Sequence, residues 1–221
     1  MEFNQRLRRS ISEDQSELKL SLESPSKVTK ALNLHSFQGS LVNRKCYQDL
    51  RNIIERNVVA GNEMNFSALG SPGLGKPYFL LYMLIHLSTK THTAVFLNTL
   101  RGHRYVVFPG NDEVFKFRTF DDCEDALTLP ASENGVFYQL YDAGTKGGKS
   151  DPIVPDPDLV TIVASSPDKS NYREFAKDKP QELYMEPRSY GELKLANRLL
   201  STPLDERVLR KRHALAGGIP R

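Results

Sequence analysis

Short apolar runs alternate along this chain with longer segments whose apolar residues have helical spacing. Between residues 76 and 90 the run FLLYMLIHLS is apolar on nearly every side, which predicts a deeply buried helix. Strands that alternate with helices are typical of an α/β fold whose central strands are parallel. The predicted buried strands are Met64–Leu69, Thr93–Leu97, Gly135–Tyr141 and Leu159–Ala164.

Further elements complete the predicted fold around this mostly parallel sheet. Asn43–Asn57 repeats apolar residues at helical spacing and predicts an amphipathic helix. His103–Phe108 and Glu113–Phe120 alternate in polarity on either side of the turn sequence PGND, which predicts an inserted β-hairpin. Gly144–Asp158 is rich in glycine and proline and predicts an exposed loop. Further helices are predicted at Asp121–Leu127, Tyr172–Lys177, Ser189–Leu200 and Leu204–Ala216.

The composition sets the first 35 residues apart from the rest of the chain. They are rich in Ser, Glu, Lys and Arg, which predicts a flexible arm with some helical tendency around Glu17–Leu22. Residues 36–221 are then expected to form one domain, as the length of 221 residues and the hydrophobic content of 39% allow. The sequence contains no run of about 18 apolar residues, so it predicts no membrane-spanning helix. No signal peptide is visible at the start.

Charge and reactive residue types narrow the function classes. The net charge of +3 is only a faint indication of nucleic-acid affinity. Cys46 and Cys123 are too few for a disulfide framework or a four-thiolate zinc site, and we interpret both as core or surface residues. His86 and His92 lie on or near the buried helix without paired ligands, which indicates structural roles.

The segment GSPGLGKP, Gly70 to Pro77, carries the most specific chemistry. It fits the pattern G-x-x-x-x-G-K, follows a predicted strand and opens a predicted helix. Small residues let successive backbone N–H groups converge on phosphate oxygens, and Lys76 supplies a mobile charge for the outer phosphates. The alternative interpretation is an ordinary glycine-rich turn between a strand and a helix.

Pro77 stands where a phosphate loop normally carries Ser or Thr. It offers no hydroxyl for Mg²⁺ and no backbone N–H for a phosphate. A proline ring is tolerated in the first turn of a helix, so the fold need not suffer. We therefore expect the loop to form and to bind nucleotide with a weakened hold on the metal.

Two later strand ends supply further candidates. Asp142 ends the strand GVFYQLYD, where it is expected to hold Mg²⁺ through water, and a turn-forming role is the alternative. Ala143 follows it, so no adjacent base is visible for hydrolysis. Ser165 or Ser166, at the end of the next strand, could sense the terminal phosphate, although a simple turn before Pro167 explains them equally well.

At these residues the chain resembles the P-loop NTPase module shared by Crinkler-type effector proteins and trypanosomatid retrotransposon hot spot proteins. The matching stretches are GSPGLGKPYFLLYMLIHLS, GVFYQLYDAG, TIVASSPDKSNYREFAK, MEPRSYGEL and RHALAGGIPR. The resemblance implies a P-loop NTPase-like α/β sandwich that binds ATP or GTP with Mg²⁺. It implies Lys76 and Asp142 as catalytic residues, Asp142 as the metal ligand, and nucleotide contacts from Gly70, Ser71, Pro72, Gly73, Leu74, Gly75, Lys76, Pro77, Tyr78 and Ser166.

The resemblance also carries expectations about the whole protein. Family members act as effectors secreted into a host cell or act in the nucleus, and commonly continue into a further, often nuclease-like domain. This chain stops directly after GGIPR and lacks the ubiquitin-like delivery segment of the oomycete proteins. It is therefore expected to be either a truncated gene product or a short paralogue that acts alone.

Three functions follow from the sequence. The first is a nucleotide-binding module with weak or absent hydrolysis, because Pro77 departs from the family pattern. The second is an interaction module that keeps the fold without nucleotide. The third is association with DNA or host nuclear proteins, because residues 188–221 hold 8 Lys and Arg against 3 Asp and Glu, an excess of 8 − 3 = +5. A solvated helix face is the simpler explanation of that excess, and RVLRKRH could serve as a nuclear import signal.

Overall fold

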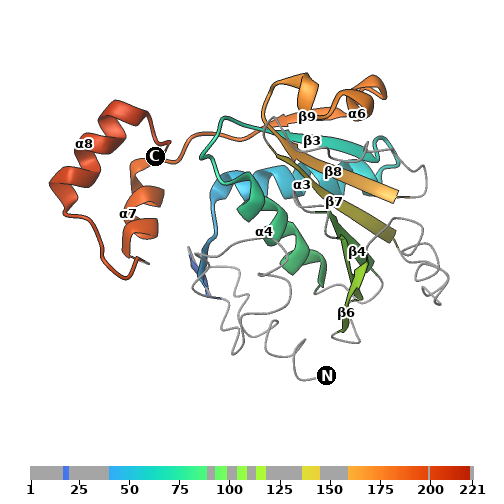
Figure 1. The fold of residues 1–221 in the computed structure, drawn as a ribbon, viewed down its shortest axis with the longest axis horizontal. Helices are drawn as coiled ribbons and strands as arrows, with labels where there is room; N and C mark the ends of the chain where they lie inside the picture. The colour runs from blue at the N-terminus through green and yellow to red at the C-terminus, as the bar shows by residue number, and fades with distance from the viewer. Residues whose placement is uncertain are drawn as a thin grey trace.

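The computed structural model describes residues 17–19, 40–88, 93–98, 104–108, 113–117, 136–144, 159–198 and 200–219. Its main feature is a seven-stranded sheet in the order β6-β5-β4-β7-β8-β3-β9 (Figure 1). The strands are β3 (Asn65–Leu69), β4 (Thr93–Asn98), β5 (Arg104–Phe108), β6 (Glu113–Phe117), β7 (Val136–Gly144), β8 (Leu159–Ser165) and β9 (Gln181–Tyr184).

The pairing confirms the predicted α/β class and its hairpin insertion. Strands β4, β7, β8, β3 and β9 pair in parallel, while β5 and β6 add to the β4 edge as an antiparallel pair. The described helices are α3 (Lys45–Val59), α4 (Lys76–Ser88), α6 (Arg173–Lys177), α7 (Tyr190–Arg198) and α8 (Glu206–Ala216), with a 3-10 turn at Lys169–Asn171. Within these ranges, no helix has the length and apolarity needed to cross a membrane.

Helices α3 and α4 cover one face of the sheet and form the larger core with it (Figure 1). The predicted helix FLLYMLIHLS is α4, and its side chains from Phe79 to Leu84 are all buried. They pack with sheet residues such as Phe66 and Ile162, whose exposed fraction is 0%. A smaller cluster on the other face joins Leu69 and Val163 to Phe175 of α6. Burial of α4 on all sides explains why its sequence lacks a polar stripe.

The C-terminal helices α7 and α8 form a hairpin beside the body of the domain and away from the sheet (Figure 1). The side chain of Asn197 donates to the carbonyl of Leu204 and accepts from its amide, both at 2.8 Å, which fixes the turn between the helices. The Asp205 carboxylate accepts from the amide of Arg207 and caps α8, and Gly217 ends it with φ +59°. Both predicted helices are thereby confirmed.

Several predictions differ from the structure or lie outside it. Glu17–Lys19 is a strand, β1, paired antiparallel with β2 (Ser40–Val42), so the helical tendency predicted at Glu17–Leu22 is wrong for those three residues. β9 was absent from the prediction because only Leu183 of its four residues is buried. Four predictions lie outside the described residues: the rest of the flexible arm, the helix at Asp121–Leu127, the PGND turn and the loop before Asp158.

Candidate functional site

Three neighbouring parallel strands end at one edge of the sheet and bring the candidate residues together. Strand β8 lies between β3, which leads into Gly70, and β7, which carries Asp142. Leu69 pairs with Ser165, Asp142 pairs with Ala164, and the amide of Gly70 donates to the carbonyl of Ser165 at 3.2 Å. The carboxyl ends of parallel strands are where open α/β sheets bind ligands, so the geometry gathers these residues at a typical site.

The loop depends on glycine at position 75. Gly75 has φ +93°, in the region that residues with side chains rarely adopt. A Cβ added there would lie 2.5 Å from the Tyr47 hydroxyl. That hydroxyl donates to the Gly75 carbonyl at 2.9 Å, and burial raises the pKa of Tyr47 to about 12, so it remains a neutral donor. The second glycine of the motif is thus required by conformation and by close packing against α3.

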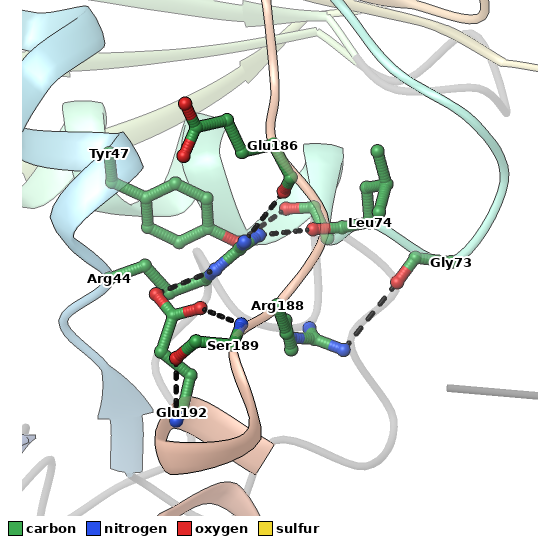
Figure 2. Close-up of polar contacts among 9 residues, drawn as sticks. Arg44, Tyr47, Gly73, Leu74, Glu186, Arg188, Ser189 and Glu192 are labelled. Carbon is green, nitrogen blue, oxygen red and sulfur yellow. Dashed lines mark hydrogen bonds and ion pairs between the residues drawn. The ribbon is translucent and has the colours of Figure 1, made fainter. Parts of the chain in front are cut away.

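Side chains from outside the loop hold its carbonyl groups (Figure 2). Arg44 donates to the carbonyl of Leu74 at 2.7 Å, and Tyr47 donates to that of Gly75. In a trans peptide the C=O and the following N–H point in opposite directions. The amides of Gly75 and Lys76 are therefore directed away from Arg44 and Tyr47, and neither donates a hydrogen bond within the described part of the chain.

Arg44 is the residue that fixes this arrangement to the rest of the fold. Its side chain is almost fully buried, with the whole residue 1% exposed. Besides Leu74, it donates to the carbonyl of Glu186 at 2.7 Å and to the carboxylate of Glu192 at 3.3 Å (Figure 2). It also stacks on Tyr47, with its guanidinium carbon 5.2 Å from the ring centre. One cation thus joins the loop, the segment after β9 and helix α7.

Lys76 lies inside the loop and binds its backbone. Its ammonium donates to the carbonyls of Gly70 at 2.8 Å and Ser71 at 3.2 Å. Burial lowers the pKa of Lys76, and the negative charge of Asp142 acts in the opposite direction. The two residues predicted as catalytic therefore interact electrostatically across the strand edge.

This electrostatic contact gives a direct test. We expect Asp142→Asn to lower the pKa of Lys76 further, because the substitution removes the charge that favours the ammonium form. The titration of the Lys76 Cε resonance by NMR measures this. Asp178→Asn, at the exposed end of α6, removes an equal charge elsewhere and should leave the titration unchanged. An unchanged Lys76 pKa in Asp142→Asn would show that the two groups are not neighbours in solution.

The other residues that the sequence predicted as nucleotide contacts lie at the start of α4 and at the end of β8. Pro77 is in the first turn of α4, as the sequence predicted, and the first backbone bond there runs from the amide of Phe79 to the carbonyl of Gly75 at 3.0 Å. Tyr78 is half-buried and packs against the main core. The Ser166 hydroxyl accepts from the Asn171 amide group at 2.6 Å, whereas the buried hydroxyl of Ser165 has no partner within the described residues.

Other reactive residue types give no second site in the described ranges. No group of three His, Cys, Asp or Glu side chains there could hold a metal ion. The Nε2 atom of His86 lies 2.7 Å from a carboxylate oxygen of Glu55, which fits the predicted structural role. Burial raises the pKa of the Cys46 thiol to about 11, so this thiol is a core group with little nucleophilic character.

Sequence reasoning found the loop but missed Arg44, Tyr47 and Arg188, which contact it from outside. Arg188 reaches Gly73 from a position 115 residues further along the chain. Arg44 and Tyr47 lie 30 and 28 residues from their loop partners. Nothing in their local sequence distinguishes them from solvated residues at a helix start, and only a three-dimensional structure reveals the contacts.

A strand that ends in a glycine loop, a lysine at the start of the next helix and a carboxylate two strands away define a P-loop domain. The family model described as "Retrotransposon hot spot protein, P-loop domain" matches residues 68–197, more than half of the chain. The chain belongs to this family. No curated protein matches it in sequence. The family description suggests nucleotide binding in general, and it leaves the Crinkler link of the sequence analysis as a resemblance only.

Proposed function

We propose that this chain binds a nucleoside triphosphate, ATP or GTP, in the loop Gly70–Pro77. One observation carries the proposal: Arg44 and Tyr47 hold the carbonyls of Leu74 and Gly75, so the amides of Gly75 and Lys76 point away from these side chains and donate to no described residue. Amides directed in this way form a concave site for anions, and the start of the buried helix α4 adds its dipole. An interaction module without nucleotide would have no need of this arrangement.

The roles of the residues follow from their present contacts. The amides of Gly75 and Lys76 would donate to phosphate oxygens. The Lys76 ammonium would exchange its bonds with the carbonyls of Gly70 and Ser71 for stronger bonds to the outer phosphates. Ser71, Pro72, Gly73 and Leu74 would form the wall of the loop, with Tyr78 and Ser166 at its borders.

Metal binding and hydrolysis are proposed to be weak. Asp142 is a half-buried carboxylate beside Lys76 and would hold Mg²⁺ through water. Pro77 offers no hydroxyl to complete the usual metal site, so the residues fit the ion only in part. Bound Mg²⁺ would supply positive charge to the outer phosphates. Ala143 follows Asp142, so no neighbouring carboxylate is placed to activate water, and slow or absent turnover is the expected result.

Replacement of Pro77 by serine tests the proposal at the position where this loop departs from the usual phosphate-loop sequence. Pro77→Ser restores one amide donor and one hydroxyl. A hydrogen bond to a charged group contributes about 1.5–3 kcal/mol, so nucleotide affinity should rise roughly ten-fold or more. The affinity should also become more dependent on Mg²⁺, because the hydroxyl can bind the metal. Fluorescence titration with a labelled ATP analogue across a Mg²⁺ series measures both effects.

Pro77→Ala is the matched control, because it restores the amide without the hydroxyl. It should gain affinity in the absence of Mg²⁺ and gain no added metal dependence. If neither variant changes the affinity or its Mg²⁺ dependence, the loop does not bind a triphosphate in the ordinary way. The interaction module would then be the better account of the domain.

Association with nucleic acid is a second candidate function. Two of the basic side chains of the C-terminal hairpin, Lys194 and Arg210, share Glu206 at 3.1 and 3.7 Å and so use their charge within the hairpin. Arg207, Lys211 and Arg212 are exposed on α8. Phosphate contacts from these three would make DNA binding fall steeply with salt, whereas a solvated face would give no binding to measure.

The cellular role is proposed from the Crinkler resemblance alone. A nucleotide-binding effector secreted into a host cell and directed to its nucleus would use RVLRKRH on α8 as an import signal. Microscopy of the tagged full chain, expressed in a eukaryotic cell with and without Arg210, Lys211 and Arg212, tests this. Equal cytosolic distribution of both proteins would argue against nuclear import.

A further inference from the structure

Arg188 is a second arginine beside the phosphate loop, and its guanidinium makes fewer contacts than that of Arg44. Its Nη1 lies 3.5 Å from the carbonyl oxygen of Gly73, at the outer limit of a hydrogen bond. A Cβ added to Gly75 would lie 3.1 Å from its Nη2. Figure 2 shows the side chain extending from the segment after β9 toward the loop. A guanidinium has five N–H donors, and within the described residues only this one long contact uses any of them.

The backbone of Arg188 is held in turn by the C-terminal glycines. The amide of Arg188 donates to the carbonyl of Gly218 at 3.2 Å. Gly218 is buried with φ +83°, and a Cβ added there would collide with the carbonyl oxygen of Arg188. Gly217 also has a positive φ, +59°, but a Cβ added to it would meet nothing within 4 Å. Close approach therefore requires glycine at position 218, while position 217 only ends the helix.

We propose that Arg188 is a second phosphate-binding cation of the nucleotide site, positioned by the packing of Gly218 against its backbone. The inference rests on the proposed nucleotide binding. A planar guanidinium can offer two parallel N–H groups to a phosphate, whereas its present bond to Gly73 is long and therefore easily exchanged. Pro77 offers no amide donor, and Arg188, which lies on the Tyr47 side of Gly75, supplies donors when its long bond to Gly73 is exchanged.

The arrangement also links the nucleotide to the C-terminal segment. If the packing of Gly218 raises nucleotide affinity by a given factor, nucleotide must stabilise that packing by the same factor. Residues 217–219 should then exchange their amide hydrogens more slowly when nucleotide is bound. The nucleotide state is thereby transmitted to the hairpin of α7 and α8, because Arg188 shortly precedes α7 and Gly218 shortly follows α8 along the chain.

A double-mutant cycle on the full chain tests the proposal. The probe is a fluorescent ATP analogue, and the variants are Arg188→Ala, Gly218→Ala and both together. Each single substitution should weaken binding by roughly ten-fold, as expected for loss of one hydrogen bond to a charged group. The double variant should bind no more weakly than Arg188→Ala, because both substitutions remove the same contact. Arg188→Lys should recover part of the affinity.

Two matched controls accompany the cycle. Gly217→Ala makes the same chemical change at a positive φ without the collision, and Arg207→Ala removes an exposed arginine of α8. Both should bind within about two-fold of the parent protein, as substitutions away from a site usually do. Thermal unfolding of every variant shows which of them are folded. If Gly218→Ala does not fold, amide exchange at residues 217–219 of the parent protein, with and without the analogue, takes its place.

The outcomes separate this inference from the proposed function. If Lys76→Ala loses binding while Arg188→Ala binds like the parent, the phosphate role of Arg188 is overturned and the nucleotide site stands. If the effects of Arg188→Ala and Gly218→Ala add, or exchange at 217–219 is unchanged by nucleotide, the positioning role of Gly218 is overturned. If the parent protein does not bind the analogue at all, both the proposed function and this inference fail.

Discussion

Arg44→Ala should cost about 3–5 kcal/mol of unfolding free energy, as removal of one partner from a buried charged network does. The substitution leaves the carbonyls of Leu74 and Glu186 and the carboxylate of Glu192 without their shared donor. It also removes the cation that stacks on Tyr47. Since domains are stable by only about 5–15 kcal/mol, the change would consume a large part of the stability.

Urea denaturation followed by circular dichroism measures this effect. Arg198→Ala is the matched control, because Arg198 is exposed at the end of α7 and its loss should change stability by about 0.5 kcal/mol or less. Arg44→Lys keeps a charge but cannot reach three acceptors at once, so its stability should lie between those of the parent and Arg44→Ala. A loss below about 1 kcal/mol in Arg44→Ala would contradict the bridging role of this residue.

Lys76→Ala should weaken nucleotide binding by about 100-fold or more, corresponding to about 2.8 kcal/mol. The ammonium is the only side-chain cation within the loop sequence itself, and each charge-assisted bond it gives to a phosphate is worth about 1.5–3 kcal/mol. The stability of the protein should fall by a smaller amount, because the substitution also removes the bonds to the carbonyls of Gly70 and Ser71.

Lys45→Ala is the matched control for the loss of nucleotide binding in Lys76→Ala. Lys45 is an exposed lysine at the start of α3, and its ammonium pairs with Asp49 at 2.6 Å. The Lys45→Ala substitution also removes one lysine charge, but from a side chain that does not contact the loop. Equal binding of a fluorescent triphosphate by the parent, Lys45→Ala and Lys76→Ala would rule out the phosphate role of Lys76.

The fold and the loop could be predicted from sequence because their signals are local. The apolar runs that became β3, β7 and β8 are buried on both faces of a parallel sheet, and such strands read as continuous hydrophobic segments. The glycine spacing of the loop is likewise contained within eight residues, Gly70 to Pro77. The sequence pattern and the structure therefore agree where the signal is contained in a short segment of the chain.

The rest depended on contacts that no local pattern records. β9 is a short edge strand with exposed Glu182 and Tyr184, so its sequence QELY has no hydrophobic signal. The positions of Arg44 and Arg188 are set by carbonyl groups far away in the chain, and a sequence shows which cations exist but not which acceptors they reach. The sequence predicts a phosphate-binding charge at Lys76, but it does not show that the ammonium also binds two carbonyls of its own loop.

The central claim is that the amides of Gly75 and Lys76 receive phosphate, and their NMR resonances test it most directly. Backbone amide spectra of the parent protein are recorded during titration with ATP, with and without Mg²⁺. The account predicts saturable shifts at Gly75 and Lys76, while Gly61 and Asp178, which lie at the ends of α3 and α6, remain unchanged. Absence of any shift at Gly75 and Lys76 at saturating ATP, or equal shifts at all four residues, would contradict the claim.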